Sequence, residues 1–357
     1  MEENKQHKTA LPETEPIPSA QAPEALLDIR GLRVEYHTDE DVVYAVNGLD
    51  LTIGKGESLG LVGETGAGKT TTALSVLRLI ADPPGKIMGG EIWFEGEDML
   101  QAKPARLREI RGSKISVIFQ DPMTSLNPVY SVGDQIAEVI HQHEKCSKEE
   151  GRRKAGDMLE MVGIPRARYD EYPHQFSGGM KQRVVIAMSI ACSPELILAD
   201  EPTTALDVTI QAQVLELMNE LKEKLRTSLL LITHDLGFVA QVCDRVAIMY
   251  AGEIVESGTI AEVFDHPHHP YTIGLFGSIP SLDETAEKLK PIQGQMPDPT
   301  ELPEGCAFAP RCPYATGACR TRKPEMTGVG GTQMVRCLAH QGVFESPKLM
   351  EEVRHGR

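Results

Sequence analysis

The stretch "GETGAGKT" at residues 63–70 constrains the fold of this chain more than any other feature. An apolar run at 58–62 precedes it and the helical pattern "KTTTALSVLRLI" overlaps its end, which is the strand–loop–helix context of a phosphate-binding loop. Its glycines let the backbone curl until N–H groups and the start of the helix face phosphate oxygens. A chance glycine-rich turn would not need these flanks. The sequence therefore predicts a nucleotide site on an α/β fold.

The loop also predicts how ATP and Mg²⁺ are held. Lys69 would bring positive charge to the β- and γ-phosphates, and the hydroxyl of Thr70 would ligate Mg²⁺. The other positions that we expect to contact the nucleotide here are Gly63, Glu64, Thr65, Gly66, Ala67, Gly68 and Thr71.

A second part of the site is predicted in "LILADEPTTALD", residues 196–207. Its first four residues are apolar and predict a fully buried central strand, whose end brings Asp200 and Glu201 to the sheet edge where ligands of open α/β folds bind. Asp200 would hold Mg²⁺ through water, and Glu201 would polarise the attacking water. Neighbouring strand residues point to opposite faces, so both can act only if the strand ends here, as Pro202 indicates.

Three further segments are weak signals when each is taken alone. Gln120 follows the apolar run "ISVIF", His234 follows "LLLIT", and Ser177 stands in a helix-capping position in "FSGGMKQR". Each has an ordinary explanation, as a loop residue, a surface histidine or a helix cap. Their order along the chain relative to the phosphate loop and "LILADE" is more informative than any one of them.

In this order the motifs resemble those of the ATP-binding cassette (ABC) ATPases, over roughly residues 26–275. The resemblance implies a P-loop NTPase with a mostly parallel core sheet, in agreement with the strand-like runs that alternate with helical patterns along the chain. It also implies a head-to-tail dimer. Ser177, Gly178 and Gly179 of one subunit would close over the γ-phosphate bound by the other, because a helix N-terminus with free N–H groups attracts anions.

The same resemblance implies roles for residues outside the phosphate loop. Tyr36 would stack on adenine, with Tyr44 as the alternative, and Gln120 would sense the membrane partner and contribute to the Mg²⁺ site. Asp207 would communicate across the dimer, and His234 would contact the γ-phosphate. Glu201, His234 and Gln120 are thus the candidate catalytic residues.

Composition divides the chain into four parts. Residues 1–25 are polar and rich in proline, and predict a disordered tail. Residues 26–265 form the ATPase domain, with a helical insertion at about 121–176 where strand signals fade. Residues 266–345 are rich in proline, glycine and cysteine and predict a small separate unit, and 346–357 a second tail.

Charge and hydropathy exclude some classes of function. The net charge of −16 over 357 residues argues against nucleic-acid binding, which needs clustered Lys and Arg. No apolar run approaches the roughly 18–20 residues that span a bilayer. The start of the sequence also lacks a basic-then-apolar signal pattern, so we expect the chain to stay in the reducing cytosol.

Several longer segments resemble one particular group of ABC ATPases. They are "FQDPMTSLNP", "SGGMKQRVVIAMSIACSPELILADEPTTALDVTIQAQVLELM", "HPHHPYT" and "GCAFAPRCPYA", and together they resemble the ATPase subunits of bacterial oligopeptide and dipeptide importers, a group that includes nickel importers. The resemblance implies a peripheral ATPase on the cytoplasmic face of the cell membrane. Its partners would be two membrane permease subunits, a second related ABC ATPase in a heterodimer or homodimer, and indirectly a solute-binding protein. The alternatives are an importer of nickel or another small solute, or a soluble non-transport ABC ATPase.

Four of the seven cysteines lie close together, at Cys306, Cys312, Cys319 and Cys337. A cytosolic location disfavours disulfides, and the spacing leaves zinc, an iron–sulfur cluster or free buried thiols open. A unit of this size with few large apolar side chains is hard to stabilise without a cross-link. The resemblance favours a 4Fe-4S cluster, which some peptide-importer ATPases carry in this region.

Overall fold

The computed structural model describes residues 25–120, 122–203, 207–278 and 291–355, and most of the predicted N-terminal tail lies outside these ranges. Its largest element is a mixed eight-stranded sheet in the order β11-β12-β10-β9-β3-β8-β7-β6. Five neighbouring strands are parallel. They are β6 (Ile115–Ile118), β7 (Leu196–Asp200), β8 (Ser228–Thr233), β3 (Ser58–Val62) and β9 (Arg245–Tyr250). The prediction of an α/β fold with a mostly parallel core is confirmed.

Both faces of the parallel strands are covered, which explains why β3 and β8 are buried along their whole length and mostly apolar. Leu230 and Ile232 face a core made with helix α1 (Lys69–Val76) and a second sheet. Leu229 and Leu231 face the opposite core, which includes residues of α6, α7 and α8. These helices are α6 (Gly178–Ile190), α7 (Val208–Leu225) and α8 (Leu236–Val242).

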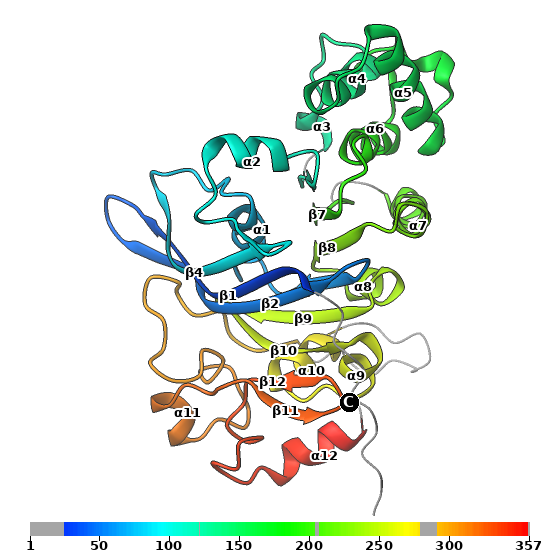
Figure 1. Ribbon diagram of the computed structural model, residues 1–357. Coiled ribbons are helices and arrows are strands. Elements are labelled where there is room, and N and C mark those ends of the chain that lie inside the picture. Colours follow the sequence, from blue (N-terminus) through cyan, green and yellow to red (C-terminus); the bar gives the residue numbers. More distant parts are fainter. Residues whose placement is uncertain (1–24, 121, 204–206, 279–290, 356–357) are drawn as a thin grey trace, which may run out of the picture.

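The second sheet is antiparallel, in the order β2-β1-β4-β5, and crosses over α1 at the left of Figure 1. Its strands are β1 (Ala25–His37), β2 (Val42–Gly54), β4 (Gly85–Phe94) and β5 (Glu97–Asp98), and α2 (Pro104–Ile110) follows. Long alternating strands such as β1 bury one face and expose the other, as antiparallel sheets on a core do.

Short helices occupy residues 122–176, where the sequence predicts a helical insertion. They lie with α6 at one end of the molecule (Figure 1) and are α3 (Pro122–Ser125), α4 (Val132–His143), α5 (Lys148–Met161), η1 (Arg166–Arg168) and η2 (Pro173–Gln175). Ser131 and Ser147 cap α4 and α5, each by accepting a backbone N–H.

The chain after residue 265, called the C-terminal region below, does not form a sheet of its own in the ranges that the structure describes. Strand β12 (Gln333–Val335) pairs with β10 (Glu253–Thr259), and β11 (Thr327–Gly330) pairs with β12, so the region extends the main sheet. Helix α9 (Ile260–Asp265) follows β10, and the later helices are α10 (Pro270–Phe276), α11 (Gly317–Thr321) and α12 (Pro347–His355).

Two sequence expectations need correction. Strand β7 is next to the edge strand β6 rather than central, and its Ile197 is only half-buried and lines an apolar cavity. The stretch 346–357, predicted as a tail, contains α12, because Leu349 and Val353 bury their side chains against the C-terminal region.

Candidate nucleotide site

The phosphate loop connects the end of β3 to the start of α1, as the sequence predicts. Gly66 and Gly68 have φ angles of 85° and 101°, in the left-handed region that favours glycine. A Cβ at Gly68 would lie 2.3 Å from the carbonyl oxygen of Ala45, so no other residue fits there. At Gly68 the loop therefore approaches its neighbours too closely for a side chain, and at Gly66 the positive φ favours glycine.

Lys69 is buried in the loop that it completes. Its Nζ donates to the carbonyl oxygens of Gly63 (2.7 Å) and Glu64 (3.0 Å). Burial lowers the pKa of Lys69, and the nearby carboxylates of Glu201 and Asp200 oppose that shift. The ammonium group is thus positioned inside the loop, where phosphate oxygens can replace the backbone carbonyls.

Asp200 and Thr70 form a pair of oxygen donors beside Lys69. Asp200 is only 5% exposed, and burial raises its pKa while a hydrogen bond from the Thr70 hydroxyl opposes the rise. Its Oδ1 atom has no hydrogen-bond partner among the residues that the structure covers. A buried carboxylate oxygen without a partner next to a hydroxyl is a donor set that suits Mg²⁺.

Glu201 lies one residue further, where β7 has ended. Its φ of 45° is unusual for a residue other than glycine, and this turn lets Glu201 and Asp200 reach the same sheet edge. Gln120 Nε2 donates to Glu201 Oε2 (2.9 Å), and His234 Nδ1 lies 3.2 Å from Oε1. These three residues follow the adjacent strands β6, β7 and β8, whose carboxyl ends meet at one edge.

The two candidate adenine-binding tyrosines differ in their surroundings. The hydroxyl of Tyr36 lies 3.2 Å from Thr71 Oγ1, so Tyr36 borders the first turn of α1. Tyr44 is 38% exposed, and its backbone N–H donates to the carbonyl of Pro299 in the C-terminal region (2.9 Å). Of the pair, Tyr36 is the one that contacts the helix of the phosphate loop.

The Ser-Gly-Gly segment forms the start of the 13-residue helix α6, where Ser177 is exposed, Gly178 half-buried and Gly179 buried. Ser177 caps this helix by accepting the N–H of Met180, and a Cβ at Gly179 would lie 2.4 Å from Ile210 Cγ2. Asp207 caps the neighbouring helix α7 by accepting the N–H of the same Ile210 (3.0 Å). Residues 204–206, which complete this motif, lie outside the described ranges.

The four C-terminal cysteines line one cavity, together with apolar side chains that include Phe308 and Leu338. The N–H of Cys306 donates to the carbonyl of Cys319 (2.8 Å), which joins two of the segments. Burial raises the pKa of Cys306 to about 11 and that of Cys312 to about 12. No three His, Cys, Asp or Glu side chains within the described ranges are grouped closely enough to hold a single metal ion.

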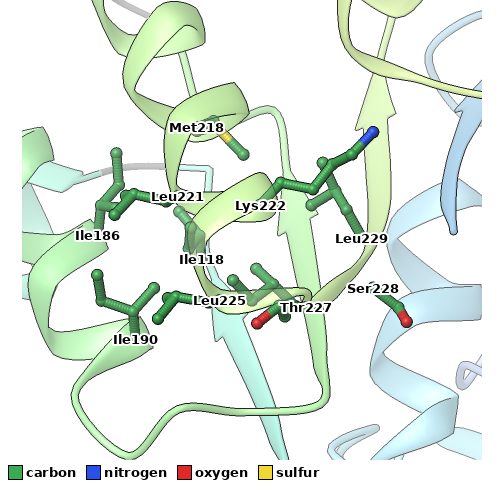
Figure 2. A pocket seen from close by; sticks show the side chains of 11 residues that line it. Ile118, Ile186, Ile190, Met218, Leu221, Lys222, Leu225, Thr227, Ser228 and Leu229 are labelled. Carbon is green, nitrogen blue, oxygen red and sulfur yellow. The ribbon is translucent and has the colours of Figure 1, made fainter. Parts of the chain in front are cut away.

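A second cavity is apolar and lies under α6 and α7 near the end of β6 (Figure 2). Ile118, Ile186 and Leu225 are among its lining residues, and Lys222 directs its ammonium away to the hydroxyl of Ser58 (2.8 Å). Its walls lack the converging polar groups of a nucleotide site, so it is a packing feature.

The sequence interpretation missed one group of contacts at the phosphate loop. Tyr271, Met296 and Arg311, all from the C-terminal region, lie against Glu64 or Gly66. The only sequence signal was indirect, because Arg311 stands beside Cys312 within the cysteine-rich segment.

Comparisons with known proteins agree with this geometry. The model of the family "ABC transporter" matches residues 46–204, and that of "Oligopeptide/dipeptide transporter, C-terminal region" matches residues 255–319. A solved dimeric, post-hydrolysis ATP-binding cassette bound to ADP and Pi superposes with a TM-score of 0.59 at 27% identity, over 66% of this chain and 98% of that one. The fold and the site therefore define an ABC ATPase.

Similar proteins show to which group of ABC ATPases the chain belongs. The chain is 50% identical over 314 residues to the oligopeptide transport ATP-binding protein OppD of Bacillus subtilis, covering 87% of this chain and 88% of that protein. It is 48% identical to the dipeptide transport ATP-binding protein DppD of the same organism, covering 88% and 94%. The chain belongs to the ABC transporter ATP-binding proteins of the oligopeptide/dipeptide transporter family.

Proposed function

We propose that this chain hydrolyses ATP to energise the import of oligopeptides or dipeptides. The observation that carries the catalytic part is the cluster of Gln120, Glu201 and His234 at one sheet edge, beside the phosphate loop. The cargo class follows from family membership and from the relatives that transport oligopeptides and dipeptides. The chain is the ATP-binding subunit of such an importer.

Within the site, each residue has a role that its position supports. Lys69 binds the β- and γ-phosphates, and Thr70 and Asp200 would hold Mg²⁺. When bound, Mg²⁺ neutralises charge on the phosphate oxygens. Glu201 orients the attacking water and accepts its proton, while Gln120 and His234 fix the carboxylate from both sides.

The start of α6 acts in trans. Ser177 and Gly178 lie at an exposed helix N-terminus, which attracts anions and carries no base or metal ligand of its own. It therefore suits a clamp on the γ-phosphate held by a partner cassette, with Asp207 at the neighbouring cap. The solved relative is a dimer. The partner would be a second related ATPase or another copy of this chain.

The membrane partners dock on the helical part of the chain. Val129 and Tyr130 are 72% and 54% exposed between α3 and α4, and Phe119 is 47% exposed beside Gln120. Such exposed apolar side chains mark contact surfaces. Phe119 precedes Gln120 in the chain, so the proposed surface includes the neighbour of a residue of the catalytic cluster. Two permease subunits would contact it at the cytoplasmic face of the membrane. Among the helices that the structure describes, none is long and apolar enough to cross a bilayer.

The four cysteines are proposed to hold a 4Fe-4S cluster, with Zn²⁺ as the alternative. The observation that supports a shared site is that all four cysteines line one cavity, and the resemblance to peptide-importer ATPases favours the cluster over Zn²⁺. The pKa values of Cys306 and Cys312 are raised by burial, so loading would have to release protons from these thiols. The cluster would act as a structural staple for a region with a small core of its own.

The metal proposal is tested by anaerobic purification with iron, sulfide and zinc analysis of the same sample. About four irons per chain are expected, and Cys319→Ser should lower iron content and loosen the region. Cys192→Ser, which removes a half-buried thiol outside the cavity, is the matched control. Zinc, or no metal, would contradict the cluster and leave the ATPase proposal intact.

The transport proposal is tested with Glu201→Gln and with uptake. The variant should bind ATP and hydrolyse it at least about 100-fold more slowly, since a general base is lost. Glu216→Gln, an exposed carboxylate on α7, is the control. Near-normal turnover in the variant would refute the role of Glu201. In the assembled transporter, ATP-dependent uptake of labelled peptides is expected, and uptake of nickel in their place would refute the cargo class.

A further inference from the structure

The C-terminal region makes direct contacts with the phosphate loop, and these contacts converge on Glu64. The side chain of Arg311 reaches it from the cysteine-rich segment, with Nη1 lying 3.0 Å and 3.2 Å from the two carboxylate oxygens. The hydroxyl of Tyr271 accepts the backbone N–H of Glu64 (3.0 Å), and Lys69 donates to the Glu64 carbonyl. Contacts therefore hold both the backbone and the side chain of Glu64.

Glu64 is an unfavourable residue for a phosphate-binding loop, because its negative charge repels phosphates. The carboxylate is near enough to Lys69 to act on that ammonium electrostatically. Arg311 supplies the opposite charge. Its side chain is 6% exposed and that of Glu64 is 31% exposed, so water screens the pair less than it would a surface pair.

Arg311 is itself held by the C-terminal region and by strand β9. Its Nε donates to the carbonyl of Gln293 (3.1 Å), and its Nη1 also lies 3.3 Å from the hydroxyl of Tyr250. A Cβ at Gly66 would lie 3.1 Å from Met296 Cε, so a second C-terminal side chain covers the loop two residues further on. A guanidinium held on several sides has little freedom left to lose when it pairs with Glu64.

We infer that Arg311 is a positioning residue of the nucleotide site: it neutralises Glu64 and holds the phosphate loop in the conformation that binds ATP. The C-terminal region is thus part of the ATP site in its own chain. Arg311 has no contact with Gln120, Glu201 or His234 in the contacts described. Its loss should therefore weaken ATP binding more than it slows the hydrolytic step.

The test compares Arg311→Gln with the double variant in the full-length protein, with MgATP as the probe and equilibrium titration as the readout. Arg311→Gln should weaken MgATP binding about tenfold, because a partly buried carboxylate is left unpaired beside the phosphates. The double variant Glu64→Gln/Arg311→Gln should bind MgATP more tightly than Arg311→Gln, because the repelling charge is gone. Arg320→Gln, an exposed arginine of α11, should bind like the unmodified protein.

Two outcomes would overturn the inference. One is unchanged MgATP affinity in Arg311→Gln; the other is a double variant that binds no better than Arg311→Gln, which would mean that Arg311 acts only as a fold contact. If Arg311→Gln does not fold, Arg311→Lys keeps the charge but loses the Nε donor to Gln293, and should bind with a smaller loss that Glu64→Gln removes. The KM for ATP should rise in each variant that binds MgATP more weakly, while kcat changes little. A fall in kcat with an unchanged KM would also overturn the inference.

Discussion

Glu262 allows a quantitative test of how the C-terminal hairpin is attached to the ATPase core. Its carboxylate accepts the N–H and hydroxyl of Thr259 (both 2.9 Å) and those of Thr332 (2.8 Å and 2.6 Å). One side chain thus caps α9 and holds the turn between β11 and β12. Burial alone would raise its pKa, but the hydrogen bonds from Thr332 and Thr259 lower it to about 2.

This pKa shift sets how much Glu262 stabilises the folded protein and the pH range over which it does so. A fall from 4.5 to about 2 corresponds to roughly 3 kcal/mol at most, and partial exposure reduces the expected contribution to about 1–2 kcal/mol. Because the folded-state pKa lies below the unfolded value, the stabilisation is complete above pH 4.5 and is lost as the pH falls towards 2.

Glu262→Gln is therefore expected to lower the melting temperature at pH 7 by about 2–4 °C. Thermal unfolding should be followed from pH 7 down to pH 3, because the difference from the unmodified protein should shrink below pH 4.5. Glu304→Gln removes an exposed carboxylate of the same region and serves as the control. A difference that is independent of pH, or equal to that of the control, would refute the reasoning.

Three further predictions follow from single positions. Gly68→Ala should abolish MgATP binding in a titration, because the new Cβ would overlap the Ala45 carbonyl and because residue 68 has a φ of 101°, which alanine rarely adopts. Measurable binding would contradict this prediction. Gln182→Met should raise the free energy of unfolding by about 1–2 kcal/mol, because the fully buried amide of Gln182 has no hydrogen-bond partner in the described part of the chain. Thermal unfolding measures this, and a lower melting temperature in the variant would show that the amide has a partner. Leu349→Ala should cost about 2–3 kcal/mol and speed proteolysis of α12, and an unchanged cleavage rate would show that α12 is not docked through this residue.

Most residues of the nucleotide site could be predicted from the sequence, because short motifs identify them. The phosphate loop needs glycines at fixed spacing between a strand and a helix, and an apolar run must stop where Asp200 and Glu201 emerge. Gln120 and His234 also follow apolar runs. Parallel strands bring their carboxyl ends to one edge, so residues 81 and 33 positions from Glu201 in sequence end within hydrogen-bond distance of it.

The C-terminal region was harder to predict from the sequence. Its short strands and few apolar residues give weak periodicity, so the sequence predicted a separate unit and a tail, whereas β12 pairs with β10 and α12 buries Leu349. Strand pairing depends on which edges are free after the core has folded, and no local pattern encodes that.

The sequence by itself determined the class of protein and the chemistry of its site, because phosphate binding and water activation require particular residue types at particular spacings. Only the tertiary structure decided which distant segment completes the phosphate loop. The contact between Glu64 and Arg311 joins residues 247 positions apart, and it exists because the C-terminal chain folds back over the end of β3. Contacts of that kind depend on the packing of whole elements, which the residues on either side of them do not reveal.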